Sequence, residues 1–176
     1  MVTPLTFPST LIADEQVTLR LAQDSDAELI SSWTRAPEVN EFWAGRVVPV
    51  DEVLAKYTGR RLPAVVSYVI HDAANPVGYL QAWQHAGRFG LDMFIAAEAQ
   101  GRTVGPRAAR ALALELSLRG WTPLTVDPAV DNARAISAWR AAGFVPTGEF
   151  SVDNGRRTRV MTFRGPSARS DSHVNP

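Results

Sequence analysis

Two glycines and two arginines in a short polar turn are the residues of this sequence best placed to bind an anion. They are Gly101, Arg102, Gly105 and Arg107, and they follow a strand pattern and precede a helix pattern. The first N–H groups of a helix lack carbonyl partners and lie at the positive end of its dipole, so anions bind there. Glycines let the backbone approach such a ligand closely, and arginines add positive charge. The turn is a candidate phosphate site, although an ordinary tight connection before a helix would have the same residues.

Carboxylates lie near this turn on both strands that flank the helix. Asp92 interrupts an apolar run in the preceding strand, where a carboxylate within hydrogen-bond reach of a ligand could accept a proton. The same side chain could instead be a structural carboxylate bonded to a backbone amide or an arginine. Asp127 ends the following strand, and the Asp-Pro pair that it begins is also a common start of a turn. We interpret Asp92 as a functional residue and Asp127 as a binding residue.

The turn is similar to a known motif. The segment 100–105 (QGRTVG) resembles the Gln/Arg-x-x-Gly-x-Gly/Ala signature of the GCN5-related N-acetyltransferases (GNAT), with Thr103 in place of the inner glycine. Downstream, Asp127-Pro128, the segment 132–139 (NARAISAW) and the segment 142–144 (AGF) resemble the later cofactor segment of that family. Two ordered motifs at this separation are more specific than either motif alone.

This resemblance implies a fold, a cofactor and an activity. The fold is α/β (α+β), with a mixed, mostly antiparallel sheet of about seven strands, splayed central strands and about four helices. The activity is direct acetyl transfer from acetyl-CoA to an amine, with Asp92 as the catalytic base. The gap between the splayed strands would take the pantetheine arm, and the turn would hold the pyrophosphate. The cofactor-binding residues that the resemblance implies are Met93, Phe94, Ile95, Gln100, Gly101, Arg102, Thr103, Val104, Gly105, Arg107, Asn132, Ala135 and Trp139.

Two of these residues have alternative roles. Many family members place a tyrosine at the position of Trp139, and a tyrosine hydroxyl can protonate the departing thiolate, whereas an indole offers only an N–H donor. The Trp139 N–H could hydrogen-bond the sulfur, or its ring could simply pack on the sheet. Asn132 is a helix cap, a ligand of the pantetheine arm, or both.

A closer resemblance extends from Val17 to Phe163 and is to the aminoglycoside 6'-N-acetyltransferases. The segments that carry it include 40–45 (NEFWAG), 68–70 (YVI), 76–79 (PVGY), 90–92 (GLD) and 125–128 (TVDP). It implies transfer of acetyl to the 6'-amine of an aminoglycoside. Such a substrate carries several ammonium groups, so carboxylates should line its groove. The substrate-binding residues that this resemblance implies are Glu41, Trp43, Asp92, Asp127 and Asp153.

Other functions remain compatible with the sequence. N-acyltransferases of siderophore assembly share the Asp-Pro segment but commonly have histidine where this chain has Asp92. An enzyme that acetylates a protein N-terminus, a lysine or another small amine is a further alternative. The non-enzyme alternative is an acyl-CoA-binding regulatory domain, which Thr103 and Trp139 keep open. The pair Phe42-Trp43 could be a hydrophobic plug at one end of the core instead of a wall of the substrate groove.

Periodicity and turn residues predict the order of the elements. Strands are expected at 17–21, 64–72, 77–84, 89–96, 122–128, 145–152 and 157–163. Helices are expected at 25–35, 51–58, from about 106 to 120 and 132–144, with an irregular segment over 36–50. Asn75-Pro76 indicates a turn, and Asp153-Asn154-Gly155 is a strong hairpin signal. The strand, helix and strand around the phosphate turn should form a parallel, right-handed crossover.

Length and composition indicate one domain and exclude several functions. We expect residues 1–15 to be an N-terminal arm, 16–164 the acetyltransferase domain and 165–176 a disordered tail. The 18 basic and 18 acidic residues balance, which disfavours a nucleic-acid partner. The chain has no cysteine, and its three histidines show no ligand spacing, so we expect no metal site. The N-terminus has no signal-peptide pattern, and no run of about 20 apolar residues suggests a membrane span. We therefore expect no membrane partner, a cytoplasmic location, and a monomer or homodimer.

Overall fold

The structure is a computed structural model that describes residues 6–165. Within these residues the chain forms one eight-stranded sheet with the strand order β1-β2-β3-β4-β5-β6-β8-β7. All neighbouring strands are antiparallel except β5 and β6, which are parallel. The strands are β1 Thr10–Ile12, β2 Val17–Leu21, β3 Val65–Asp72, β4 Asn75–His85, β5 Arg88–Ile95, β6 Leu124–Val126, β7 Phe144–Asp153 and β8 Arg156–Phe163.

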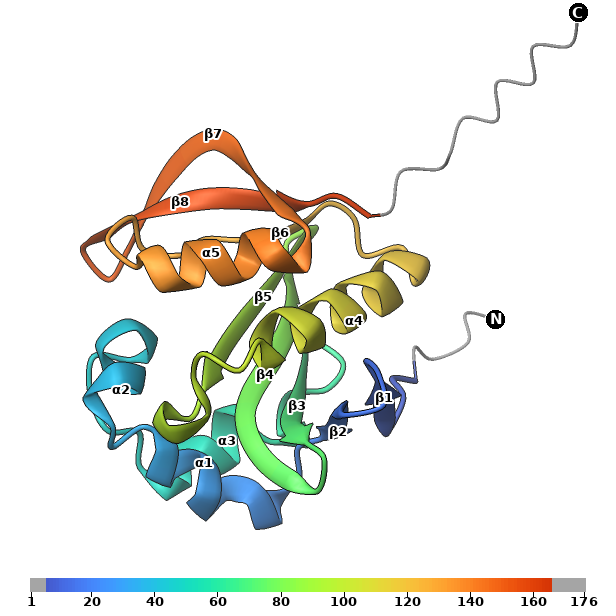
Figure 1. Ribbon diagram of the computed structural model, residues 1–176, viewed down its shortest axis with the longest axis vertical. Helices are drawn as coiled ribbons and strands as arrows, with labels where there is room; N and C mark the ends of the chain where they lie inside the picture. Colours follow the sequence, from blue (N-terminus) through green and yellow to red (C-terminus); the bar gives the residue numbers. More distant parts are fainter. Residues whose placement is uncertain (1–5, 166–176) are drawn as a thin grey trace, which may run out of the picture.

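Five α-helices in the described residues cover the two faces of this sheet (Figure 1). Helix α4 buries Val104, Ala108, Leu112 and Leu116, spaced four residues apart, against one face, and α5 packs beside it. The other face is covered by the shorter helices α1 to α3, which share a second apolar cluster with β3 to β5. The helices are α1 Ala27–Trp33, α2 Pro37–Trp43, α3 Val50–Lys56, α4 Val104–Leu118 and α5 Ala133–Ala142, with 3-10 turns at Asp24–Asp26, Gly59–Arg61 and Ala97–Ala99.

The two central strands diverge soon after they meet. The parallel ladder joins Phe89 to Leu124 and Gly90 to Thr125, and then β6 ends at Val126 while β5 continues to Ile95. The Thr125 hydroxyl donates to the Phe89 carbonyl at 3.0 Å, so this carbonyl points toward β6. Because backbone groups alternate sides along a strand, the N–H groups of Met93 and Ile95 also face the gap. The divergence therefore leaves a row of backbone donors without a neighbouring strand.

The order of elements agrees with the prediction, but two elements were missed. Residues 10–12 form the edge strand β1, paired with β2, where only a surface arm was expected. Three residues are too few to show a period in the sequence. Helix α2 lies in the segment that was expected to be irregular. The proline that suggested irregularity, Pro37, occupies the first turn of the helix, where a backbone N–H is not needed for a hydrogen bond within the helix.

Three predicted boundaries were also wrong. The turn expected at Asn75-Pro76 lies at residues 73–74, and Pro76 is within β4 beside a register shift at His71, where the ladder does not need its N–H. Helix α3 begins at Val50 rather than after Asp51. Helix α4 begins at Val104, so that Pro106 is its third residue. The hairpin turn at 154–155 is confirmed, whereas the expected tail lies outside the described residues except for Gly165.

Candidate functional site

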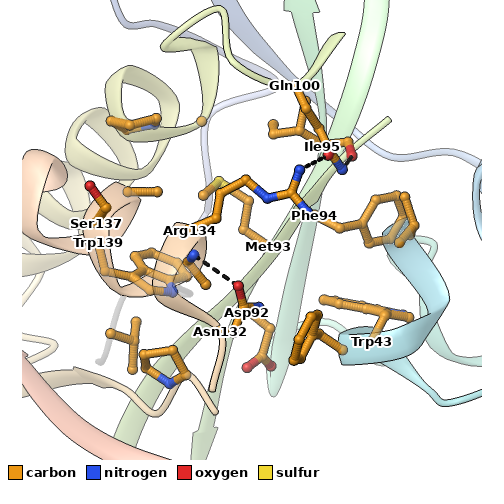
Figure 2. Close-up of a pocket in the computed structure, with 18 of the residues that line it drawn as sticks. Trp43, Asp92, Met93, Phe94, Ile95, Gln100, Asn132, Arg134, Ser137 and Trp139 are labelled. Carbon is orange, nitrogen blue, oxygen red and sulfur yellow. Dashed lines mark hydrogen bonds between the residues drawn. The ribbon is translucent and has the colours of Figure 1, made fainter. Parts of the chain in front are cut away.

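A cavity of about 690 Å³ lies where the central strands diverge. Its walls are β5, the turn before α4, helix α5, the β7–β8 hairpin and helix α2, and Figure 2 shows part of the lining. Arg102 and Arg134 line it near the turn, whereas three carboxylates and one guanidinium, those of Asp92, Asp127, Asp153 and Arg156, line it at the other end. The cavity therefore has a basic end and an acidic end, although the charges of the whole chain balance.

The basic end is built around the first turn of α4. Gly101 has a φ of +82°, and Thr103, the residue before the helix, has a φ of 60°. These left-handed conformations turn the chain so that the N–H groups of Val104 and Gly105, which begin the helix, have no carbonyl partner within it. A Cβ on Gly105 would lie 3.1 Å from the Met93 Cε, so a glycine lets this turn approach β5. The free N–H groups at the start of α4 suit an anion. Thr103 holds the chain in this position in a left-handed conformation that a β-branched residue rarely adopts.

Gln100 connects this turn to two other walls. Its Nε2 donates to the Ile95 carbonyl at 3.0 Å. Its Oε1 accepts from Arg134 Nη1, and Figure 2 shows the Arg134 side chain extending from α5 across the cavity. Arg107 behaves differently, because its guanidinium binds Asp14 and lies outside the cavity lining.

Helix α5 supplies the wall opposite β5. Asn132 is its N-cap, and the Asn132 Oδ1 accepts a hydrogen bond from the Ala135 N–H at 3.0 Å. Trp139 is buried, packs edge-on against Phe144 with ring centroids 5.2 Å apart, and also lines the cavity. The cap role of Asn132 and the packing role of Trp139 are thus present in the structure, and both residues remain beside the cavity.

Three carboxylates meet at the acidic end. Asp92 is partly buried, and its Oδ2 accepts a 2.9 Å hydrogen bond from Gln81 Nε2. Burial raises the pKa of Asp92, Gln81 opposes this rise, and the charge of Asp153 adds to it. Asp127 keeps contact with solvent, yet partial desolvation and the charges of Asp92 and Asp153 raise the pKa of Asp127 to about 6. All three carboxylates line the same cavity, so one ligand with several cationic groups can contact them together.

Aromatic residues form the wall beside these carboxylates. The Trp43 ring lies 4.8 Å from Phe94 and 5.7 Å from Tyr79, centroid to centroid. Trp43 therefore plugs the core and lines the cavity at once. Glu41 lies outside the cavity lining, and its carboxylate faces the Arg156 guanidinium at 4.0 Å.

The structure thus brings together most of the predicted site residues and separates two, Glu41 and Arg107, from the cavity. It also adds residues that sequence reasoning missed, which are Gln81, Arg134, Arg156 and Thr158. Thr158 is buried, and its hydroxyl finds no hydrogen-bond partner in residues 6–165. Arg134 had a signal, since it stands inside the second motif, whereas the other three come to the site through strand pairing that the sequence does not display.

The residues present fit a ligand with a long polar arm and phosphates. The open edge of β5 offers the N–H groups of Met93 and Ile95, and the start of α4 offers those of Val104 and Gly105. Arg102 lies beside the second group of donors. Among the described residues, no group of three histidine or acidic side chains is arranged to hold a metal ion. In the same range, no helix has the length and apolarity needed to cross a membrane.

This fold and cavity define an acyltransferase cleft, and comparison with known families agrees. A family model described as "Acetyltransferase (GNAT) domain" matches residues 22–152, which is more than half of the chain. The chain belongs to the GNAT acetyltransferase family. It is an N-acetyltransferase that takes its acetyl group from acetyl-CoA.

Solved structures share the fold at low sequence identity. AAC(6')-Ib in complex with ribostamycin and coenzyme A is 24% identical, covers 90% of this chain and 100% of its own, and has a TM-score of 0.77. The same enzyme with coenzyme A and kanamycin, at 24% identity, covers 83% and 93% with a TM-score of 0.72. The microcin C7 self-immunity acetyltransferase MccE, with acetyl-CoA and AMP, is 16% identical, covers 89% and 96%, and has a TM-score of 0.72. A comparison with curated proteins gives no match.

Proposed function

We propose that this N-acetyltransferase modifies a primary amine of a polycationic aminoglycoside, namely its 6'-amine. The observation that carries the proposal is the convergence of Asp92, Asp127 and Asp153 at one end of the cavity, next to the open edge of β5. Several carboxylates in one groove attract and orient an acceptor that bears several ammonium groups. The fold shared with AAC(6')-Ib, which has been solved with ribostamycin and with kanamycin, supports the same acceptor class.

Each part of the site has a role in this reaction. Acetyl-CoA, when bound, supplies an activated thioester carbonyl. Asp92 accepts the proton that the acceptor ammonium must lose before its nitrogen can attack, and a raised pKa makes this carboxylate a stronger base. The N–H groups of Met93 and Ile95 orient the donor arm and polarise the carbonyl oxygen. Holding both reactants in place contributes on the order of 7–11 kcal/mol when the geometry is near ideal.

The remaining residues divide between the two ligands. Asp127 and Asp153 bind further ammonium groups of the acceptor, and Trp43 is a wall against which a sugar ring packs. The turn 100–105 and Arg102 hold the phosphates of the donor. The Trp139 N–H donates to the departing sulfur, and water or the substrate supplies the final proton, because an indole does not release one at neutral pH.

A pair of acceptors tests the proposal directly. Purified protein is incubated with acetyl-CoA and either an aminoglycoside that has a 6'-amine or its counterpart with a hydroxyl at that carbon. Release of free thiol with the amine and not with the hydroxyl is the expected result. Turnover with an N-terminal peptide, a lysine peptide or a simple monoamine, and none with aminoglycosides, would overturn the acceptor while leaving the acetyltransferase class intact.

A further inference from the structure

A row of polar side chains crosses the centre of the sheet and ends at Asp92. In the antiparallel register Ser67 of β3 faces Gln81 of β4, and Gln81 faces Asp92 of β5. The three residues lie on the face that α1 to α3 cover, where their neighbours Val69, Tyr79 and Phe94 are apolar or aromatic. Polar groups in such surroundings are stable only when they bond to one another.

The Tyr79 hydroxyl connects Ser67 to Gln81. It lies 2.8 Å from Ser67 Oγ and 3.0 Å from Gln81 Oε1, and the Tyr79 side chain is fully buried. An amide oxygen only accepts, so the single Tyr79 proton is donated to Gln81 Oε1, and the Ser67 hydroxyl donates to the Tyr79 oxygen. With its oxygen bound to Tyr79, the Gln81 amide turns its Nε2 toward Asp92, which it meets at 2.9 Å from Oδ2.

We propose that Ser67 and Tyr79 are positioning residues, which act through Gln81 to hold the Asp92 carboxylate in one orientation and in its charged form. The proposal rests on the proposed function, in which Asp92 is the base. Gln81 touches Asp92 directly, whereas Tyr79 acts one hydrogen bond further away and Ser67 two. None of the three was identified from the sequence as a site residue.

The arrangement matters because an unanchored amide has two orientations of similar shape. A half-turn of the Gln81 amide would place its Oε1 against the Asp92 carboxylate, which replaces an attraction by a repulsion. A donor to the charged carboxylate favours the base form, and an acceptor disfavours it. Tyr79 also contacts Trp43, so the same side chain supports the aromatic wall and orients the base.

Several other titratable or hydrogen-bonding groups face Asp92 and Tyr79 and also influence the titration of Asp92. Asp92 also faces the Trp83 indole on β4, the Asp153 carboxylate on β7 and Asp127 after β6. Tyr79 faces the Tyr57 hydroxyl after α3 and the Arg61 guanidinium. Tyr79→Phe replaces none of these groups. A change in the Asp92 titration in this variant therefore reports on the row of hydrogen bonds.

Tyr79→Phe tests the proposal, since it deletes the hydroxyl and keeps the ring. Tyr68→Phe is the matched control, because Tyr68 is also a buried, hydrogen-bonded tyrosine. It lies on the neighbouring strand and the opposite face, and its hydroxyl donates to the Pro8 carbonyl at 3.0 Å. The carbon-13 shift of the Asp92 carboxyl is followed against pH in protein without acceptor, and Asp92→Asn assigns its resonance. The Asp92 titration should move to higher pH in Tyr79→Phe and stay in place in Tyr68→Phe.

Two further variants keep the result decisive. Gln81→Met removes the donor with little change of shape and should shift the Asp92 titration at least as far, and Ser67→Ala should shift it less. If an acceptor is turned over, kcat/KM on the acid side of the pH profile should fall about fivefold in Tyr79→Phe, with a plateau close to wild type. An unchanged Asp92 titration in Gln81→Met, or equal shifts in Tyr79→Phe and Tyr68→Phe, overturns the proposal. Absence of turnover in the wild type contradicts the proposed acceptor only, because the carboxyl titration needs no reaction.

Discussion

Arg107 Nε and Nη2 each donate a 2.6 Å hydrogen bond to the carboxylate of Asp14, which lies 93 residues earlier in the chain. The same carboxylate accepts from the N–H groups of Gln16 and Val17 at 2.9 Å. These donors, Arg107 first, hold the pKa of Asp14 far below its usual range. The pair ties the turn after β1 to the first turn of α4, and it directs Arg107 away from the cavity.

Arg107 and Arg102 should therefore differ when each is replaced by glutamine. Arg107→Gln should lower the unfolding midpoint by a few degrees, less so in high salt, because both partners remain partly exposed. Arg102→Gln should lower the midpoint less, because the Arg102 guanidinium is exposed and approaches Asp72 only to 3.9 Å, and should weaken coenzyme A binding by about threefold to tenfold through a lost charged contact. Thermal unfolding and calorimetric titration with coenzyme A check both. An equal loss of coenzyme A affinity in the two variants would return Arg107 to the cofactor site.

Asp92→Asn should reduce turnover at least tenfold, equivalent to about 1.4 kcal/mol in the barrier. The amide cannot accept the proton of the acceptor ammonium. Coenzyme A affinity should stay nearly unchanged, because the turn and Arg102, rather than the Asp92 side chain, are assigned to the donor. Steady-state kinetics with a kanamycin-type acceptor and a coenzyme A titration measure the two quantities. Asp51→Asn, on the exposed side of α3, is the control for a lost charge. Wild-type turnover in Asp92→Asn would remove this residue from catalysis.

Local signals in the sequence predicted most of the fold. The turn before α4, the cap at Asn132 and the hairpin at Asn154-Gly155 each depend on a few adjacent residues, and the structure contains all three. The parallel pairing of β5 and β6 followed from the strand, helix and strand order. Such features could be read because the residues that stabilise them are neighbours in the chain.

Long-range pairing was what the sequence could not reveal. Arg107 stands two residues after Gly105, which made it a site candidate, but its partner is a carboxylate in the N-terminal segment. Gln81 reaches Asp92 through the register of two strands, and a slip of one residue would place its side chain on the opposite face. Physical proximity to the base therefore depended on a register that composition and periodicity leave open.

Thr103→Gly should stabilise the protein. A β-branched residue in the left-handed region costs about 1–2 kcal/mol, and glycine removes this cost while losing about 0.5–1 kcal/mol through a more flexible unfolded chain. The expected net gain is up to about 1.5 kcal/mol in the free energy of unfolding, measured by denaturant titration. Asn154→Gly is the control, because Asn154 has a φ of 47° but asparagine tolerates that region. A larger gain in Asn154→Gly than in Thr103→Gly would contradict the assignment of strain to Thr103.

Thr158→Val should leave stability unchanged or raise it, by up to about 1 kcal/mol, because it replaces a buried hydroxyl that has no partner in the described residues with a methyl of the same shape. Thr125→Val provides the contrast, since the Thr125 hydroxyl is bonded to Phe89 and its loss should destabilise. A stability loss in Thr158→Val equal to that in Thr125→Val would show that the Thr158 hydroxyl is already satisfied.

Acceptor binding should weaken as the pH falls through about 6, the raised pKa of Asp127. Above this pH the carboxylate is charged and attracts an ammonium group, and below it the carboxyl is neutral. Calorimetric titration of an aminoglycoside between pH 5 and pH 8 should show this loss in the wild type and a flatter, weaker dependence in Asp127→Asn. Asp131→Asn, an exposed residue outside the cavity lining, should retain the wild-type dependence.

The raised pKa of Asp127 also affects stability, but in the opposite direction: a higher pH favours acceptor binding and lowers the stability of the free protein. An aspartate whose pKa is higher in the folded than in the unfolded protein binds more protons when folded, so stability falls as the pH rises from the ordinary value of 3.8 to about 6. At pH 8 the charge on Asp127 is a cost, caused by partial desolvation and by Asp92 and Asp153, that a bound polycation would offset. Asp127→Asn should therefore unfold at a higher temperature than the wild type at pH 8, and at a similar one at pH 4, in the absence of ligand. A lower unfolding temperature in Asp127→Asn at pH 8 would mean that the carboxylate stabilises the fold and is not held in place for a ligand.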